Sequence, residues 1–315
     1  MARVPSWLPE PPCTGDVVRL TLDVPLDEPP FVEEVLPRRS LLKRADAGGS
    51  SQQQALAANV DVVAVVAAFD PVAKRSVHAG RIERMLTLAW ASGAEPVVLL
   101  TKADLHPDAD EVAASLAART ACTVLPVSSR TGAGLDDVRG LLEGGRVVAL
   151  LGPSGAGKSS LVNALADAET MAVQEVRGDG KGRHTTVTRE LRRVAGGAVI
   201  DGPGLRGAGL AGGEADDGSL DRAFADVAAL AERCRFADCA HESEPGCAVR
   251  GAVAAGSLNP DRLAAWRKLQ AESRWQERRR DARLASEDRA AVRALHRGAY
   301  KEIRERSRAK NRGRR

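Results

Sequence analysis

The sequence predicts an α/β fold in which helices cover a mainly parallel sheet. Short apolar runs rich in valine and leucine recur in the central part of the chain, at 60–70, 96–100, 123–127, 146–151 and 198–200. Segments with apolar residues at near-helical spacing lie between the first of these runs, at 73–92, 108–119 and 135–142. Strands that alternate with helices form parallel sheets, and such sheets bind ligands beyond the carboxyl ends of their strands.

The N-terminal segment, residues 1–54, is rich in proline and turn residues. Its runs 16–22 and 31–36 alternate like half-buried strands, and Asp46 to Gln54 has the composition of a loop or linker. Two strands do not make a stable independent sheet. We therefore expect this segment to lean on its neighbour or to stay partly mobile.

The most specific motif is a glycine-rich loop that fits the phosphate-binding pattern G-x-x-x-x-G-K-[ST]. It follows the apolar run 146–151, and a helix is predicted from Ser160 onward. We expect Lys158 to reach the β- and γ-phosphates of a nucleotide and the Ser159 hydroxyl to ligate Mg²⁺. The alternative is a glycine-rich turn without a ligand. The expected contacts are Gly152, Pro153, Ser154, Gly155, Ala156, Gly157, Lys158, Ser159 and Ser160.

A second motif, from Thr101 to Asp104, follows the run 96–100 and is close to the N-K-x-D guanine signature. A carboxylate accepts hydrogen bonds from the ring N–H and the exocyclic amine of guanine, and adenine offers no such pair of donors. Asp104 therefore predicts GTP rather than ATP, with Lys102 over the base. Thr101 replaces the usual asparagine, which predicts one weaker hydrogen bond to the base or the phosphate loop. The alternative is a strand-end turn with a solvated carboxylate.

Three further segments complete the expected nucleotide site. Ser128 and Ser129 follow the run 123–127, and we expect a main-chain N–H there to contact guanine. We expect the D-x-P-G sequence to supply the Asp201 carboxylate, which would support the ligands of Mg²⁺ from behind, and near Gly204 an N–H for the γ-phosphate. One threonine of the adjacent pair Thr185 and Thr186 should close over the metal, and the sequence leaves the choice open.

The group that would orient the attacking water is not evident from the motifs. Ras-like enzymes place a glutamine after D-x-x-G, whereas this chain has Leu205. A leucine cannot orient water, so we expect slow intrinsic hydrolysis. His184 is the nearest candidate for a catalytic substitute, and an ordinary surface-loop histidine is the alternative.

Four potential metal ligands fall within a short stretch: Cys234, Cys239, His241 and Cys247. Three thiolates and an imidazole fit a tetrahedral Zn²⁺ with no open position, which is a structural site. The surrounding sequence would build no core unaided, so we expect the metal to hold it together. We expect Cys13 and Cys122, the remaining cysteines, to be buried or incidental thiols.

Charge is unevenly distributed along the chain. The net charge is +4, but residues 261–315 hold 19 Lys and Arg against 8 Asp and Glu. A basic tail on a mildly acidic body suits a polyanionic partner such as RNA. A solvated charged helix is the alternative. We find no apolar run long enough to span a membrane and no signal peptide, which predicts a cytoplasmic protein.

The order of the motifs resembles that of a circularly permuted GTPase. In a Ras-like GTPase the phosphate loop comes first, whereas here the two guanine motifs precede it. Together with Gly182-Arg183-His184-Thr185-Thr186, D-x-P-G and C-x₄-C-x-H-x₅-C, this order resembles the bacterial family of small-ribosomal-subunit-dependent GTPases. The resemblance extends over about residues 14–260.

This resemblance implies an N-terminal OB-fold, a permuted GTPase domain and a mostly helical C-terminal zinc domain that act on the 30S subunit late in its maturation. It also implies that the subunit stimulates GTP hydrolysis. Gly15 to Val18 and Val35 to Ser40 resemble the second half of the OB barrel, with little room before them. We therefore expect only a truncated OB-like segment there.

The expected organisation is a truncated OB-like segment, a permuted GTPase domain, a zinc domain and a basic helical tail, over residues 1–54, 55–215, 216–260 and 261–315. The expected ligands are GTP or GDP, Mg²⁺ and one structural Zn²⁺, and the expected partners are the 30S subunit and 16S rRNA. We expect a monomer without a membrane partner. An alternative function is a GTP-gated rRNA-binding scaffold with little hydrolysis, and a third is a permuted GTPase that acts on the large subunit.

Overall fold

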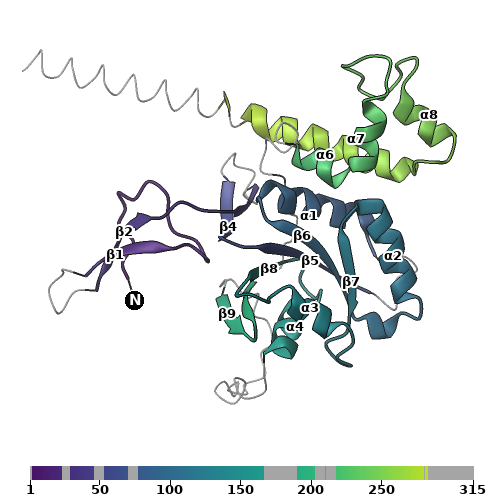
Figure 1. Ribbon diagram of the computed structural model, residues 1–315. Helices are drawn as coiled ribbons and strands as arrows, with labels where there is room; N and C mark the ends of the chain where they lie inside the picture. Colours follow the sequence, from purple (N-terminus) through teal and green to yellow (C-terminus); the bar gives the residue numbers. More distant parts are fainter. Residues whose placement is uncertain are drawn as a thin grey trace, which may run out of the picture.

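The computed structural model contains an N-terminal β region, a central sheet domain and a helical C-terminal region (Figure 1). It describes residues 2–22, 29–45, 53–69, 77–166, 190–202, 210, 218–279 and 281–282. Several residues singled out in the sequence lie outside this described part: His184, Thr185, Thr186, Gly204, Leu205 and Arg304 to Arg315.

The centre of the molecule is a six-stranded sheet in the order β7-β6-β5-β8-β10-β9. All neighbours pair in parallel except β9 and β10, which are antiparallel. The middle strands are valine- and leucine-rich because helices cover both faces, which leaves no solvated side. The strands are β5 (Val62–Ala68), β6 (Glu95–Thr101), β7 (Thr123–Val127), β8 (Val147–Leu151), β9 (Glu190–Val194) and β10 (Gly197–Asp201).

Helices cover both faces of this sheet (Figure 1). Along β5, Val63 and Val65 join the hydrophobic cluster formed with α1 (Ala79–Ala91) and α2 (Ala109–Thr120). The alternate residues Val62 and Val66 join the cluster formed with α3 (Leu135–Gly140) and α4 (Lys158–Leu165). The predicted three-layer α/β fold is therefore confirmed.

Three strands were not anticipated from the sequence. β3 (Leu41–Ala45) pairs with β4 (Gln53–Ala58), and β9 forms an edge of the central sheet. β4 is alanine-rich and has no β-branched residue, so nothing in its composition favours a strand. Four of the five β9 residues are exposed, and its sequence ELRRV is mostly charged, so it lacks the apolar run by which the other strands of the sheet were predicted.

The N-terminal region has a second antiparallel pair, β1 (Val18–Thr21) with β2 (Phe31–Val35). Both predicted strands are thus confirmed, and the two pairs form separate sheets among the described residues. The region leans on the start of the sheet domain, because the Ala58 N–H donates to Thr14 O and Asn59 Nδ2 donates to Gly15 O. Its division from the sheet domain and its OB-like character stay predictions.

The C-terminal region consists of α6 (Ser219–Ala223), α7 (Ala225–Ala231), α8 (Ala248–Ala254) and a helix over residues 260–279. It packs on α1, and its buried residues belong to the same hydrophobic cluster as that face of the sheet. Hence a continuous core crosses from the sheet domain into the C-terminal helices. None of the helices in the described part of the chain is long and apolar enough to cross a membrane.

Buried ion pairs join the two regions across this core. Arg262 is 1% exposed, and its guanidinium donates to Glu83 on α1 at 2.8 Å and to both carboxylate oxygens of Asp226. Glu83 also accepts from Arg119 on α2 at 2.7 Å. A charged side chain is this deeply buried only when it is paired, so these contacts fix how the C-terminal helices sit on the sheet domain.

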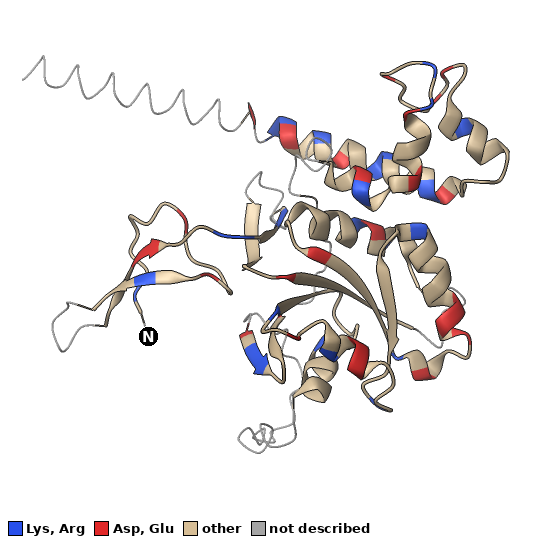
Figure 2. Ribbon diagram, viewed as in Figure 1, with Lys and Arg blue, Asp and Glu red and all other residues tan. Residues whose placement is uncertain are grey.

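A second link involves the chain segment that follows Asp201. Glu272, on the 260–279 helix, accepts from Arg84 at 2.6 Å and from the Leu210 N–H at 3.0 Å. Acidic and basic residues are interspersed along this helix (Figure 2), which holds Asp261, Glu272 and Glu277 among its basic residues. The basic excess of the tail therefore lies mainly in residues 283–315, outside the described part of the chain.

Candidate nucleotide site and metal cluster

The loops that carry the sequence motifs meet at one edge of the central sheet. β6, β7, β8 and β10 run parallel, and their carboxyl ends lead to Thr101, Ser128, Gly152 and Asp201 respectively. Ligands of α/β proteins bind at this edge, because strand ends and helix N-termini converge there. The structure thus brings the expected nucleotide-binding segments together, as far as they are described.

The phosphate loop lies tightly against the neighbouring strand. A Cβ on Gly152 would lie 2.4 Å from the Val66 carbonyl oxygen, so only glycine fits there. Lys158, the first residue of α4, is buried and donates from Nζ to the carbonyls of Gly152 and Pro153, both at 3.0 Å. Burial lowers the pKa of Lys158, and the nearby Asp201 carboxylate partly opposes this shift.

The two residues expected near Mg²⁺ are in contact. Ser159 Oγ donates to Asp201 Oδ2 at 2.9 Å, which joins the start of α4 to the end of β10. A hydroxyl beside a carboxylate at a helix N-terminus matches the donor set that Mg²⁺ uses next to nucleotide phosphates. The remaining exposed residues of this segment, Ser154, Gly155 and Ser160, border the same edge.

Thr101 fastens the phosphate loop to the guanine motif. Its buried hydroxyl donates to the Ala156 carbonyl at 2.6 Å, and it lies 3.3 Å from the Ala67 carbonyl. The sequence suggested a weakened hydrogen bond where threonine replaces asparagine. In the structure the threonine hydroxyl makes this hydrogen bond to the phosphate loop, and the expected weakening relative to asparagine stays a prediction.

The Asp104 carboxylate is held by two donors from the loop after β7. The Ser128 hydroxyl donates to Oδ1 at 2.5 Å, and Arg130 donates from Nε and Nη2 to Oδ2 at 2.9 and 2.8 Å. The Ser128 hydrogen bond, followed by the Arg130 contacts, lowers the pKa of Asp104. Asp104 is therefore a charged acceptor at the carboxyl end of β6, and Ser129, next to Ser128 in the loop after β7, is half-buried.

Arg130 was missed in the sequence. The sequence feature that could have pointed to Arg130 is its position two residues after Ser128, in a loop that was already expected to contact guanine. Lys102, by contrast, is exposed and has a left-handed backbone with φ 59°, so it makes the turn between β6 and the short 3₁₀ helix η1 (Ala103–Leu105).

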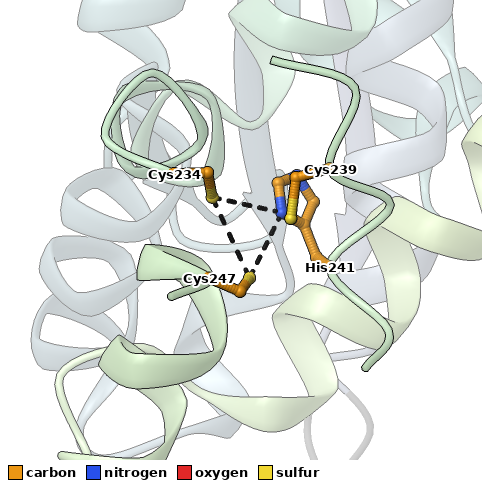
Figure 3. A group of neighbouring side chains, drawn as sticks. All are labelled: Cys234, Cys239, His241 and Cys247. Atoms are coloured by element: carbon orange, nitrogen blue, oxygen red, sulfur yellow. Dashed lines mark hydrogen bonds between the residues drawn. The ribbon is translucent and has the colours of Figure 1, made fainter. Parts of the chain in front are cut away.

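The C-terminal region places the four expected metal ligands together (Figure 3). The ligand atoms of Cys234, Cys239, His241 and Cys247 all lie within 4.8 Å of one another. His241 Nδ1 is 3.6 Å from Cys234 Sγ and 3.5 Å from Cys247 Sγ. Cys247 caps α8, Cys234 follows α7, and the other two come from the loop between them.

This cluster fits a metal ion by its chemistry and its setting. Three sulfur atoms and one imidazole nitrogen are the donors of closed tetrahedral sites. His241 is buried, with its ring 5.3 Å from the Trp266 ring, and it adopts a left-handed backbone with φ 59°. Such a backbone is uncommon for histidine, so the loop is shaped to bring the imidazole to the sulfurs.

The fold and these sites define a circularly permuted GTPase with a Cys₃His metal-binding cluster. The strand that leads to the phosphate loop, β8, lies beside β5 in the sheet, yet β6 and β7, which lead to the two expected guanine motifs, precede it in the chain. The family model described as RsgA GTPase matches residues 35–211. The chain belongs to the RsgA GTPase family and is a GTP-hydrolysing enzyme.

Named relatives and solved structures agree with this assignment. The small ribosomal subunit biogenesis GTPase RsgA of Streptomyces coelicolor is 49% identical over 87% of this chain and 74% of its own length. The protein of the same name from Opitutus terrae is 44% identical over 85% of this chain and 72% of its own length.

Among solved structures, YloQ, titled a circularly permuted GTPase, matches with a TM-score of 0.57 at 25% identity, over 86% of this chain and 84% of its own. YjeQ from Thermotoga maritima gives a TM-score of 0.55 at 27% identity, over 82% of this chain and 83% of its own. The expected permutation is therefore confirmed.

Proposed function

We propose that this chain binds GTP and Mg²⁺ at the carboxyl edge of its sheet and hydrolyses GTP on the small ribosomal subunit, whose late maturation it assists. The observation that carries this proposal is the convergence of the phosphate loop, Asp201 and Asp104 at one sheet edge. The names of the relatives, small ribosomal subunit biogenesis GTPases, support the choice of partner.

We assign the residues of the site as follows. Lys158 contacts the β- and γ-phosphates, and it can exchange its two carbonyl partners for phosphate oxygens, which are stronger acceptors. Ser159 would hold Mg²⁺ directly, with Asp201 behind it. Asp104 reads the guanine edge, and Ser128 holds the carboxylate in place. His184, one of Thr185 and Thr186, and Gly204 remain assignments from sequence alone.

Bound Mg²⁺ would neutralise charge on the phosphates, while the chain's own groups orient the nucleotide. Thr101 holds the loop carbonyl of Ala156 and so keeps the phosphate and base halves of the site at a fixed spacing. The cluster of Cys234, Cys239, His241 and Cys247 would hold one structural Zn²⁺, because four protein ligands complete a tetrahedral site and leave no position open for a substrate.

We further propose that 16S rRNA is the direct partner, through the basic tail, and that the protein is a cytoplasmic monomer. The support is the charge of residues 261–315 and the ribosomal role of the named relatives. Phosphate contacts of this kind weaken steeply with salt. Binding to 30S subunits should therefore fall as the salt concentration rises.

The deciding experiment is GTP turnover with and without purified 30S subunits at low salt, with ATP and with 50S subunits as controls. We expect a large rise with 30S and GTP only, and its loss in Lys158→Ala. A rise with 50S instead would point to the large subunit. Tight GTP binding with no turnover in any condition would support the GTP-gated scaffold, which the family membership does not favour.

A further inference from the structure

The Asp104 carboxylate, which we propose binds guanine, is also bound by an arginine side chain of this chain. Arg130 donates twice to Asp104 Oδ2, from Nε at 2.9 Å and from Nη2 at 2.8 Å. Ser128 donates once to Oδ1. A carboxylate oxygen offers about two lone-pair sites. Both sites on Oδ2 are thus taken by Arg130, and one on Oδ1 is taken by Ser128.

Guanine needs one site on each of these oxygens. Its ring N–H and its exocyclic amine lie side by side and donate in parallel to the two oxygens of a carboxylate, as the proposed site requires of Asp104. Oδ1 has room for this beside the Ser128 hydroxyl, but Oδ2 does not. Guanine therefore displaces at least one of the two Arg130 contacts when it binds.

The surroundings allow this exchange. The Arg130 side chain is 74% exposed, so it can swing away without disturbing a core. The backbone around it is held, because the Ser128 N–H donates to Ala133 O and the Thr131 N–H donates to Ser128 Oγ. Only the arginine side chain needs to move, while Ser128 keeps Asp104 in place.

We propose that Arg130 competes with guanine for Asp104 and so sets the affinity and base selectivity of the nucleotide site. This inference rests on the proposed guanine site. An arginine that recaptures the carboxylate weakens GTP and GDP binding equally, because the competition occurs at the base and not at the phosphates. Adenine nucleotides, which make no paired contact with the carboxylate, are unaffected by it.

The test measures the affinities of fluorescent GDP, GTP and ADP for wild type, Arg130→Ala and Arg130→Lys. An exposed ion pair is worth little, so Arg130→Ala should tighten GDP and GTP alike by roughly two- to fivefold and leave ADP unchanged. The GDP and GTP affinities of Arg130→Lys should lie between those of wild type and Arg130→Ala, since one ammonium cannot fill both sites on Oδ2 as the guanidinium does. The gain should shrink at high salt, because screening weakens the wild-type pair.

The matched control is Arg139→Ala, which removes the same charge from an exposed pair with Asp136 on α3 and corrects for the altered field at the anionic ligand. Weaker or unchanged GDP binding in Arg130→Ala, after this correction, would overturn the competition. A wild-type protein that does not prefer GDP over ADP would instead overturn the guanine site itself.

Discussion

The buried arginine between the sheet domain and the C-terminal helices gives a sharp test of the fold. Arg262→Met keeps an apolar stem of similar length but removes the guanidinium that bonds Glu83 and Asp226. Glu83 is fully buried, and among the described residues its Oε2 has no hydrogen-bond partner and Arg119 alone would remain to balance its charge. Breaking one side of a buried ion pair costs about 3–5 kcal/mol.

The measurement is urea unfolding, followed by tryptophan fluorescence and by circular dichroism. Because one core crosses between the two regions, we expect a single transition whose free energy drops by that amount in Arg262→Met. Glu83→Gln combined with Arg262→Met should recover part of the loss, since no charge is then left buried. The control is Arg146→Met, which removes an exposed ion pair with Glu95. Its free energy of unfolding should fall by less than about 1 kcal/mol.

If Arg262→Met cost no more than Arg146→Met, the reasoning about the buried charge would be refuted. Two separate unfolding transitions in wild type would refute the shared core instead. The two failures are distinguishable, because the first concerns a magnitude and the second concerns the number of cooperative units.

The remaining predictions concern the two sites. Thr101→Val removes the hydroxyl that holds Ala156 O, so GTP and GDP affinity should fall about tenfold in fluorescence titrations; unchanged affinity would show that the loop does not depend on this bond. Asp104→Asn turns an acceptor into a donor, so calorimetry should show a change of preference from GDP to xanthosine diphosphate; retained GDP preference would rule out Asp104 as the base reader. The Ser128 hydrogen bond lowers the pKa of Asp104, so GDP binding should survive as pH falls through the ordinary range of aspartate, and Ser128→Ala should move its loss to higher pH; an unmoved acid limit would contradict this. Cys247→Ser should reduce the bound zinc measured by mass spectrometry and lower the Tm, and full zinc content would count against the cluster.

The sequence predicts the central fold well because its buried strands and its binding loops carry local signals. The valines of β5 and the glycines and lysine around the start of α4 are recognisable within a few residues, and a parallel sheet places the motifs that follow its strands at a common edge. The Cys₃His spacing is equally local. The same reasoning fails for β4, whose alanine-rich segment pairs with β3 and buries Leu56 and Ala57 in the large hydrophobic cluster.

Contacts between distant residues explain what the sequence did not show. Arg262 and Glu83 are 179 positions apart, and as isolated letters each reads as a solvated surface charge. The role of Thr101 likewise depends on a carbonyl 55 positions away. No periodicity or motif encodes such pairs, so they emerge only when the chain is folded.

The permuted sheet also has a consequence for how the protein is made. The turn between α3 and β8 contains Gly144 and Gly145, with φ of 78° and 82°, and an added Cβ at either would meet nothing within 4 Å. In the unpermuted order, a GTPase chain would begin and end near this turn. Here β5, β6 and β7 leave the ribosome before β8, and the edge of β5 stays without its partner β8 during seconds of synthesis. The base-binding half is thus complete in the nascent chain before the phosphate loop exists.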